Sequence, residues 1–149
     1  MSAREAARNG SGRVVGLTAD AGYQIGVRRT LPIGRDRAWD FLLSPEGRRL
    51  WLGDVTDLQL QAGAVYRSVE GIAGEFRVVK PKEQLRLTWQ PKGWEKPSTL
   101  QIRLLSSRPD KTTLSFHQEK LSDAAARERM KERWEEALAV IAERTTGEG

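Results

Sequence analysis

Few side chains in this sequence could carry out acid–base chemistry, and they are widely spaced. The one histidine, His117, alternates with Phe116, so it is predicted to lie on the face of a strand opposite the apolar side chains. A single imidazole with no carboxylate to orient it is weak evidence for a general acid or base. Four carboxylates fall near predicted loops without a spacing that demands catalysis: Asp54, Asp57, Glu70 and Glu83. We therefore expect these groups to be solvent-exposed and assign no catalytic residue.

The five tryptophans are the residues best suited to contact a small molecule. A Trp side chain has a large apolar ring and one N–H group that needs a partner, so it can form a pocket wall with a polar edge. Filling a hydrophobic core is the alternative, and it is favoured for four of them: Trp39, Trp51, Trp89 and Trp134. Trp94 differs, because it lies in a glycine-containing segment between Pro91 and Pro97, where a lid or contact residue is expected.

The amino-acid composition argues against metal and redox cofactors. The chain has no cysteine and a single histidine, which excludes disulfides, thiol nucleophiles, iron–sulfur clusters and the common zinc sites. No motif for a carboxylate-bound magnesium or calcium ion is present. The segment 71–74 begins and ends with glycine but lacks the lysine and the strand-to-helix context of a phosphate-binding loop. We expect neither a cofactor nor a metal.

The net charge of +5 and the isoelectric point near 9.9 raise the question of nucleic-acid binding. Segment 28–49 is the densest in arginine, but Asp36, Asp40 and Glu46 accompany it, and no nucleic-acid-binding signature is present. We predict a solvated basic surface and no nucleic-acid partner. No apolar run approaches the roughly 18 residues of a membrane span, and the N-terminus lacks a signal-peptide pattern, so a cytoplasmic protein is expected.

Hydrophobic patterning predicts the elements that position these side chains. Residues 1–22 are rich in Ala, Arg, Gly and Ser and are expected to form a flexible tail. We predict one domain over residues 23–145, followed by a short tail over residues 146–149. Residues 23–30 alternate as a half-buried strand. Two short helices come next, over 35–43 and from Pro45 to about Gly53, because Pro is well accepted in the first turn of a helix.

Alternation of apolar and polar residues then dominates the chain up to His117. Together with the strand over residues 23–30, it predicts about seven antiparallel strands, each with one apolar face. The other six span residues 55–60, 64–70, 76–79, 85–90, 100–104 and 112–117. Residues 121–144 are predicted as a long amphipathic helix with Met130, Trp134 and Leu138 on its apolar face. A curved antiparallel sheet wrapped around this helix, with the two short helices between the first and second strands, is the α+β architecture that buries both apolar faces.

With this order of elements, the sequence resembles the helix-grip superfamily, also called START-like or SRPBCC. Within it, the chain resembles the family named after the activator of a heat-shock-chaperone ATPase. The resemblance covers residues 23–143 and depends on an ordered set of short segments: Pro32, Ala38-Trp39, Ser44-Pro45-Glu46, Trp51, Gly63, Gly74-Glu75-Phe76, Pro81, Leu85, Thr88-Trp89, Thr112-Thr113-Leu114, Trp134 and Leu138. One departure is Arg133, where relatives often have glycine before the helix tryptophan, and it is expected to alter the mouth of any cavity.

The resemblance implies a cavity between the concave face of the sheet and the long helix, which in relatives takes apolar molecules. The side chains expected to line it are mostly large and apolar: Trp39, Trp51, Tyr66, Phe76, Val78, Leu87, Trp89, Trp94, Leu100, Ile102, Leu114, Phe116, Met130, Trp134 and Leu138. We therefore predict a non-catalytic protein, monomeric or homodimeric, that binds a small apolar or aromatic molecule.

Two other functions stay open at the level of sequence. An enzyme of the cyclase or aromatase type would use the same cavity, with Tyr66 and a loop carboxylate as the proton-transferring groups. A chaperone-interaction module is suggested by the family's name alone. Relatives that stimulate the chaperone generally have an additional N-terminal domain, whereas only the predicted tail precedes the first strand here, so this function ranks third.

Overall fold

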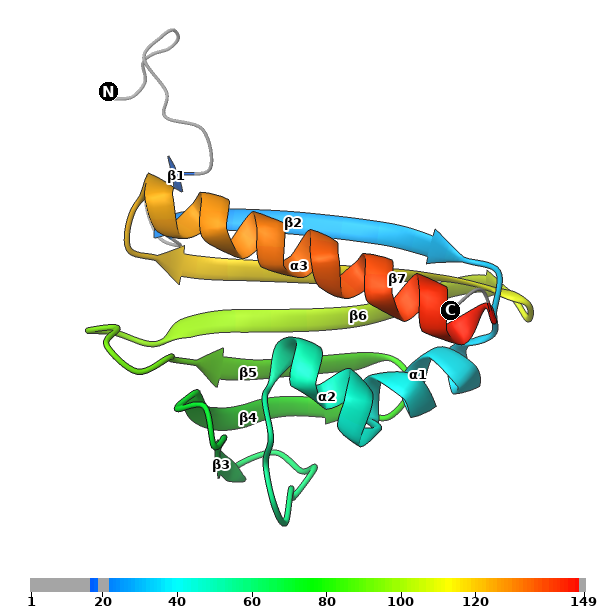
Figure 1. Cartoon of the computed structure of the whole chain (residues 1–149), viewed down its shortest axis with the longest axis horizontal. Coiled ribbons are helices and arrows are strands. Elements are labelled where there is room, and N and C mark those ends of the chain that lie inside the picture. Colours follow the sequence, from blue (N-terminus) through cyan, green and yellow to red (C-terminus); the bar gives the residue numbers. More distant parts are fainter. Residues whose placement is uncertain (1–16, 19–21, 148–149) are drawn as a thin grey trace, which may run out of the picture.

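A computed structural model describes residues 17–18 and 22–147 of the chain (Figure 1). The strands are β1 (Leu17–Thr18), β2 (Gly22–Leu31), β3 (Val65–Arg67), β4 (Ala73–Lys80), β5 (Gln84–Trp89), β6 (Ser98–Arg108) and β7 (Lys111–Leu121). The helices are α1 (Arg35–Leu43), α2 (Pro45–Trp51) and α3 (Ala124–Thr145).

The strands form one 7-stranded antiparallel sheet in the order β1-β2-β7-β6-β5-β4-β3. β2 therefore pairs with β7, the last strand of the chain, and Val27 lies opposite Phe116 in this pair. All three helices lie on one face of the sheet, with α3 running along β2 and β7 and with α1 and α2 beside it (Figure 1). The predicted α+β architecture, a curved sheet around a long C-terminal helix, is confirmed.

The strands differ from the sequence prediction in extent at several places, and at two places in whether a strand is present at all. Residues 55–60 form a loop instead of a strand, and Asp57 within it has a left-handed backbone with φ of 54°. This loop is tied to the β3–β4 turn, because the Val69 N–H donates to the Asp54 carbonyl at 2.8 Å. Within the predicted N-terminal tail, residues 17–18 pair with β2 as β1. Gly22, the last residue of that tail, begins β2. Residues 1–16 and 19–21 lie outside the described residues, and the domain boundaries stay a prediction.

Three small residues build the junction between α1 and α2. Ser44 Oγ accepts a hydrogen bond from the Gly47 N–H at 3.1 Å and so caps α2, which begins with Pro45. Gly47 approaches α1 so closely that a Cβ atom there would overlap the carbonyl oxygen of Phe41. The chain can therefore turn within one residue and carry Trp51 into the core, where it is fully buried.

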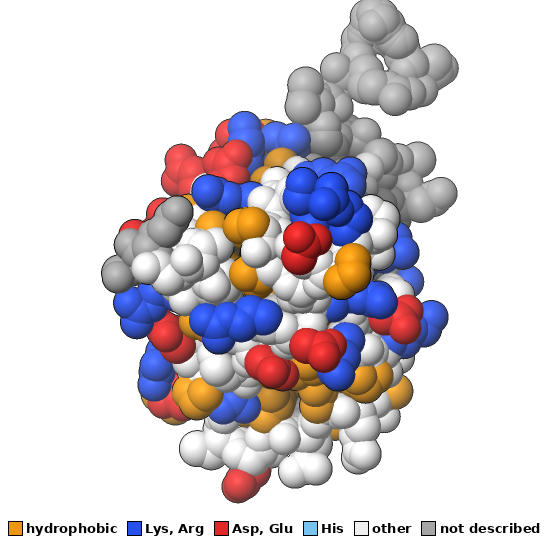
Figure 2. All heavy atoms as spheres, turned by 90° about the vertical axis from the view of Figure 1, so that its right-hand side faces the viewer, with side chains coloured by type: hydrophobic (Ala, Val, Ile, Leu, Met, Phe, Trp, Pro, Cys, Tyr) orange, Lys and Arg blue, Asp and Glu red, His pale blue; other side chains and the backbone are white. Residues whose placement is uncertain are grey.

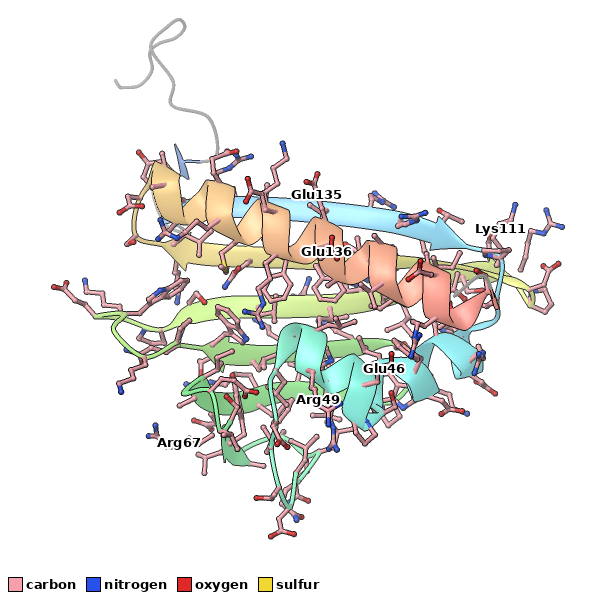
Figure 3. The ribbon with its side chains drawn as sticks, in the orientation of Figure 1. Glu46, Arg49, Arg67, Lys111, Glu135 and Glu136 are labelled. Atoms are coloured by element: carbon pink, nitrogen blue, oxygen red, sulfur yellow. The ribbon has the colours of Figure 1, made fainter. Side chains whose placement is uncertain are left out.

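The long helix α3 is capped and amphipathic, as its sequence predicts. Asp123 Oδ1 accepts a hydrogen bond from the Ala126 N–H at 2.7 Å, which satisfies a free donor of the first turn. The face that contains Trp134 is buried against the sheet. Glu135 and Glu136 are exposed and point away from the sheet (Figure 3). The helix is therefore fastened to the sheet along one side only.

Charged side chains of both signs are mixed on the surface. On the face shown in Figure 2, Lys and Arg side chains alternate with Asp and Glu side chains, and no large area of one sign is visible. Opposite charges also meet across elements, as where Arg144 of α3 contacts Glu46 of α2 at 2.6 Å. In the part of the chain that the structure describes, no helix is both long and apolar enough to cross a membrane.

Candidate functional site

Three fully buried tryptophans link the helices to one another and to the sheet through their indole N–H groups. Trp51 Nε1 donates to the Leu42 carbonyl at 3.0 Å, and Trp89 Nε1 donates to the Trp51 carbonyl at 2.8 Å. Trp134 Nε1 donates to Oε1 of Gln118 at 2.8 Å. Because each buried N–H group has an acceptor, these hydrogen bonds restrict the orientation of the rings.

Four aromatic rings form a cluster between the sheet and α3, which we call the aromatic cluster: Trp89, Trp94, Phe116 and Trp134. The centroid of the Trp134 ring lies 5.4 Å from that of Trp89 and 5.2 Å from that of Phe116. Trp94 extends the cluster outward, with its ring edge-to-face against Trp89 at 5.7 Å. These are favourable separations for aromatic pairs. The centre of the space for which the resemblance implies a cavity thus contains packed rings.

Two buried polar residues behind the aromatic cluster are absent from the predicted lining set. Gln118 Nε2 donates to Ser98 Oγ at 2.9 Å, and Ser98 Oγ donates to the Trp89 carbonyl at 2.6 Å. Together with the Trp134–Gln118 bond, this network crosses from α3 through β7 to β6 and β5. The sequence does contain a signal for Gln118. It follows Leu114 and Phe116 at intervals of two residues, so the alternation places its polar side chain on the same buried face of the strand.

The side chains predicted to line a cavity are almost all in the hydrophobic core. Every one of them is buried except Val78 and Trp94. A register shift in β4 between Phe76 and Val78 places Val79, and not Val78, against the core, which corrects the inward position predicted for Val78. Trp94 is half-buried in the β5–β6 loop. Contact of these side chains with a ligand stays a prediction.

Arg133 brings a positive charge to the aromatic cluster. Its Cζ atom lies 5.2 Å from the ring centroid of Trp89 and 5.4 Å from that of Trp134, within cation–π range. The Nε atom of Arg133 is buried and has no hydrogen-bond partner in the part of the chain that is described. Burial lowers the pKa of Arg133 while the negative charge of Glu70 opposes this shift, and the guanidinium stays protonated.

Glu70 is the loop carboxylate whose charge acts on Arg133. Its Oε1 atom accepts a hydrogen bond from the Asp54 N–H at 2.9 Å. This backbone hydrogen bond is the largest of the causes that hold the pKa of Glu70 below its usual value. The other carboxylates singled out from the sequence, Asp54, Asp57 and Glu83, are exposed, as expected.

A hollow of about 770 Å³ opens where α3 begins, and we call it the Trp94 hollow. It is lined by the β5–β6 loop over residues 93–97, by residues 120–123 from the end of β7 to the start of α3, and by Gly22 and Arg129. Figure 1 shows this loop and the start of α3 at the same end of the sheet. Small-molecule sites typically measure about 300–1,000 Å³, so the hollow has the size of such a site.

The groups considered for enzymatic chemistry do not converge on one another. The Tyr66 hydroxyl donates to the Thr88 carbonyl at 2.7 Å, and burial raises the pKa of Tyr66. His117 lies on the face of β7 opposite Phe116, as predicted, with Nε2 at 3.0 Å from Oε1 of Gln24. Among the residues that the structure describes, no group of three His, Asp or Glu side chains could hold a metal ion.

Comparison with known proteins assigns the chain to a family. The model of the "Activator of Hsp90 ATPase homolog 1-like protein" family matches residues 33–145, which is most of the described chain. The protein belongs to this family. The family suggested by the sequence resemblance is therefore confirmed. No match was found among curated proteins.

Solved structures support the fold assignment. CalU16 from Micromonospora echinospora is 21% identical with a TM-score of 0.70, and the match covers 85% of this chain and 76% of CalU16. An Hsp90 activator from Plasmodium falciparum is 16% identical with a TM-score of 0.69, covering 83% of this chain and 96% of the activator. DynU16, a protein of the dynemicin biosynthetic locus, is 19% identical with a TM-score of 0.69. The match to DynU16 covers 80% of this chain and 45% of that chain. At these identities the likeness is one of fold.

Proposed function

We propose that this protein binds a small apolar or aromatic molecule in the Trp94 hollow, at the end of the sheet where α3 begins. The observation that carries the proposal is the position of Trp94. Its ring is half-buried, lines the hollow and lies edge-to-face on the fully buried Trp89. A ligand ring that enters the hollow can therefore contact Trp94 without having to displace the centre of the core.

The β5–β6 loop holds Trp94 in this place through its backbone. The Trp94 N–H donates to the Pro91 carbonyl at 3.1 Å, and its carbonyl accepts a hydrogen bond from Nε2 of Gln90 at 2.7 Å. Gly93 has a φ of +94°, a left-handed conformation that favours glycine. An aromatic side chain that is partly exposed and is nonetheless held by its backbone is preorganised for contact with a ligand.

The lining of the Trp94 hollow suits an amphipathic ligand. Leu121, Pro97 and the Trp94 ring contribute apolar surface, whereas Lys96, Lys120 and Arg129 bring positive charge and Glu95 and Asp123 bring negative charge. A lining that combines apolar surface with charged groups can both hold and orient a small molecule. The function proposed is one of binding, because the hydroxyl of Tyr66, the candidate for proton transfer, is engaged with the backbone of Thr88.

A ligand screen by thermal shift tests the proposal. We expect at least one compound of a panel of small aromatic and apolar molecules to raise the melting temperature at saturating concentration, since binding to the folded state alone stabilises it. We expect Trp94→Ala to weaken the binding of that compound at least tenfold in calorimetry. Val65→Ala is the matched control, because Val65 is an exposed apolar residue on β3 with 77% of its surface accessible.

Two results would count against the proposed function. One is a panel in which no compound raises the melting temperature. The other is a compound that binds equally well to wild type, Trp94→Ala and Val65→Ala, since such a molecule would occupy a different part of the protein.

A further inference from the structure

Arg133 is half-buried and has an unused hydrogen-bond donor. Its Nε atom is buried and has no partner among the described residues, although its Cζ atom lies over the rings of Trp89 and Trp134. Leaving a buried donor unsatisfied is costly, and most buried polar groups in proteins avoid it. The two ring contacts attract the positive charge but accept no conventional hydrogen bond from Nε. The site therefore lacks an acceptor.

Glu70, the charged group that acts on Arg133, already accepts a hydrogen bond elsewhere. Glu70 opposes the lowering of the Arg133 pKa through its negative charge. Its Oε1 atom, however, accepts the hydrogen bond of the Asp54 N–H at 2.9 Å, and the residue is exposed on the loop. Glu70 thus favours the charged form of Arg133 without satisfying its buried Nε.

Arg133 is not among the residues that line the Trp94 hollow, but it shares with Trp94 a contact to the Trp89 ring behind it. Trp94 and the Arg133 guanidinium both lie within 6 Å of the Trp89 ring, at 5.7 Å and 5.2 Å. Arg129, which lines the hollow, precedes Arg133 by four residues and so lies on the same face of α3. Two like charges at this spacing repel each other, and an anion bound beside them relieves the repulsion.

We propose that Arg133 is the anion-binding residue of this site and that the ligand is a small aromatic carboxylate. Its ring contacts Trp94, and its carboxylate accepts hydrogen bonds from the Arg133 guanidinium. The planar guanidinium has the geometry to bind a carboxylate through two parallel hydrogen bonds, which a lysine could not do. This inference rests on the proposed function, and it adds the charge of the ligand and the residue that recognises it.

Calorimetry with a matched pair of probes tests the proposal. The probes are 2-naphthoate and 2-naphthamide, which share a ring system and differ in charge. We expect wild type to bind the acid about tenfold more tightly than the amide, as a charge-assisted hydrogen bond predicts. In Arg133→Met, the affinity for the acid should fall to that for the amide, whose own affinity changes by less than threefold.

A second arginine on the same helix provides the control for charge. Arg144→Met removes the same charge from the last turn of α3, where Arg144 contacts Glu46, and should leave both affinities unchanged. If Arg129→Met, and not Arg133→Met, abolishes the preference for the acid, recognition takes place at the rim and the proposal is wrong.

The outcomes separate the two proposals. Equal affinity of wild type for acid and amide overturns the role of Arg133 while the proposed binding function survives. Failure of both probes, together with failure of the wider panel, overturns the binding function itself. The comparison of acid and amide on wild type keeps the test decisive even if Arg133→Met does not fold.

Discussion

At the scale of single residues, buried polar groups decide how the rings beneath α3 are oriented. Gln118 accepts from the Trp134 indole and donates to Ser98, so both ends of its amide are used. Arg133 is the contrast, since its buried Nε has no partner among the described residues. The first arrangement stabilises the core by satisfying each member. The unpaired Nε of Arg133 lowers stability and leaves a hydrogen-bond donor free for the proposed ligand.

Replacing Gln118 tests the importance of the network. We expect Gln118→Leu to lower the free energy of unfolding by about 1–3 kcal/mol, because the buried Trp134 N–H loses its acceptor. Urea unfolding followed by circular dichroism measures the change. Gln101→Leu is the control, since Gln101 is only half-buried and bonds Gln84 Nε2 at 3.0 Å. Equal stability of Gln118→Leu and wild type would show that the network is energetically neutral.

At the scale of elements, close backbone approach determines how the short helices meet. Gly47 leaves no room for a side chain beside the Phe41 carbonyl, and Ser44 caps α2 at the same junction. This junction directs α2 so that Trp51 enters the core and offers its carbonyl to Trp89. The position of Trp89 under the site therefore depends on a turn far from it in the sequence.

A single methyl group at the junction tests this dependence. We expect Gly47→Ala to destabilise the protein by about 1–3 kcal/mol, as overpacking does, because the added Cβ overlaps the backbone of α1. Thermal unfolding measures the loss. Gly26→Ala is the matched control, since a Cβ on Gly26 meets the His117 ring at an ordinary 3.6 Å. An unchanged melting temperature in Gly47→Ala would mean that the helices can separate at little cost.

At the scale of the whole molecule, one layer of rings joins the helix to the sheet. Trp134 is fully buried and contacts Trp89 and Phe116, so it connects α3 with β5 and β7 at once. Because α3 packs against the sheet along one face only, this contact carries much of the attachment of the helix.

Removal of this ring should loosen the attachment of α3. We expect Trp134→Ala to lower the free energy of unfolding by about 3–5 kcal/mol, through lost burial and the cavity that remains. Urea unfolding and the near-ultraviolet circular dichroism of the aromatic residues would report it. Glu135→Ala, on the exposed face of α3 in Figure 3, should change stability by about 0.5 kcal/mol or less. Similar losses in the two variants would contradict the central place given to Trp134.

Local patterns predicted the three helices and most of the strands in their order, but not the loop over residues 55–60 or the short strand β1. The alternation through Leu114 and Phe116 predicts β7, the spacing of Met130, Trp134 and Leu138 predicts the buried face of α3, and Ser44-Pro45 predicts the break between α1 and α2. These signals depend on the 2.0- and 3.6-residue periods of the backbone, which are properties of neighbouring residues.

Such patterns did not predict how the side chains pack inside the site. Three features became visible only in the structure. They are the register shift that packs Val79 against the core in place of Val78, the hydrogen-bond network from Trp134 through Gln118 to Ser98, and the position of Arg133 over two rings. Each depends on distances between segments far apart in the chain. A period shows which side of an element is buried, whereas the volume left between buried sides depends on how all the side chains meet in three dimensions.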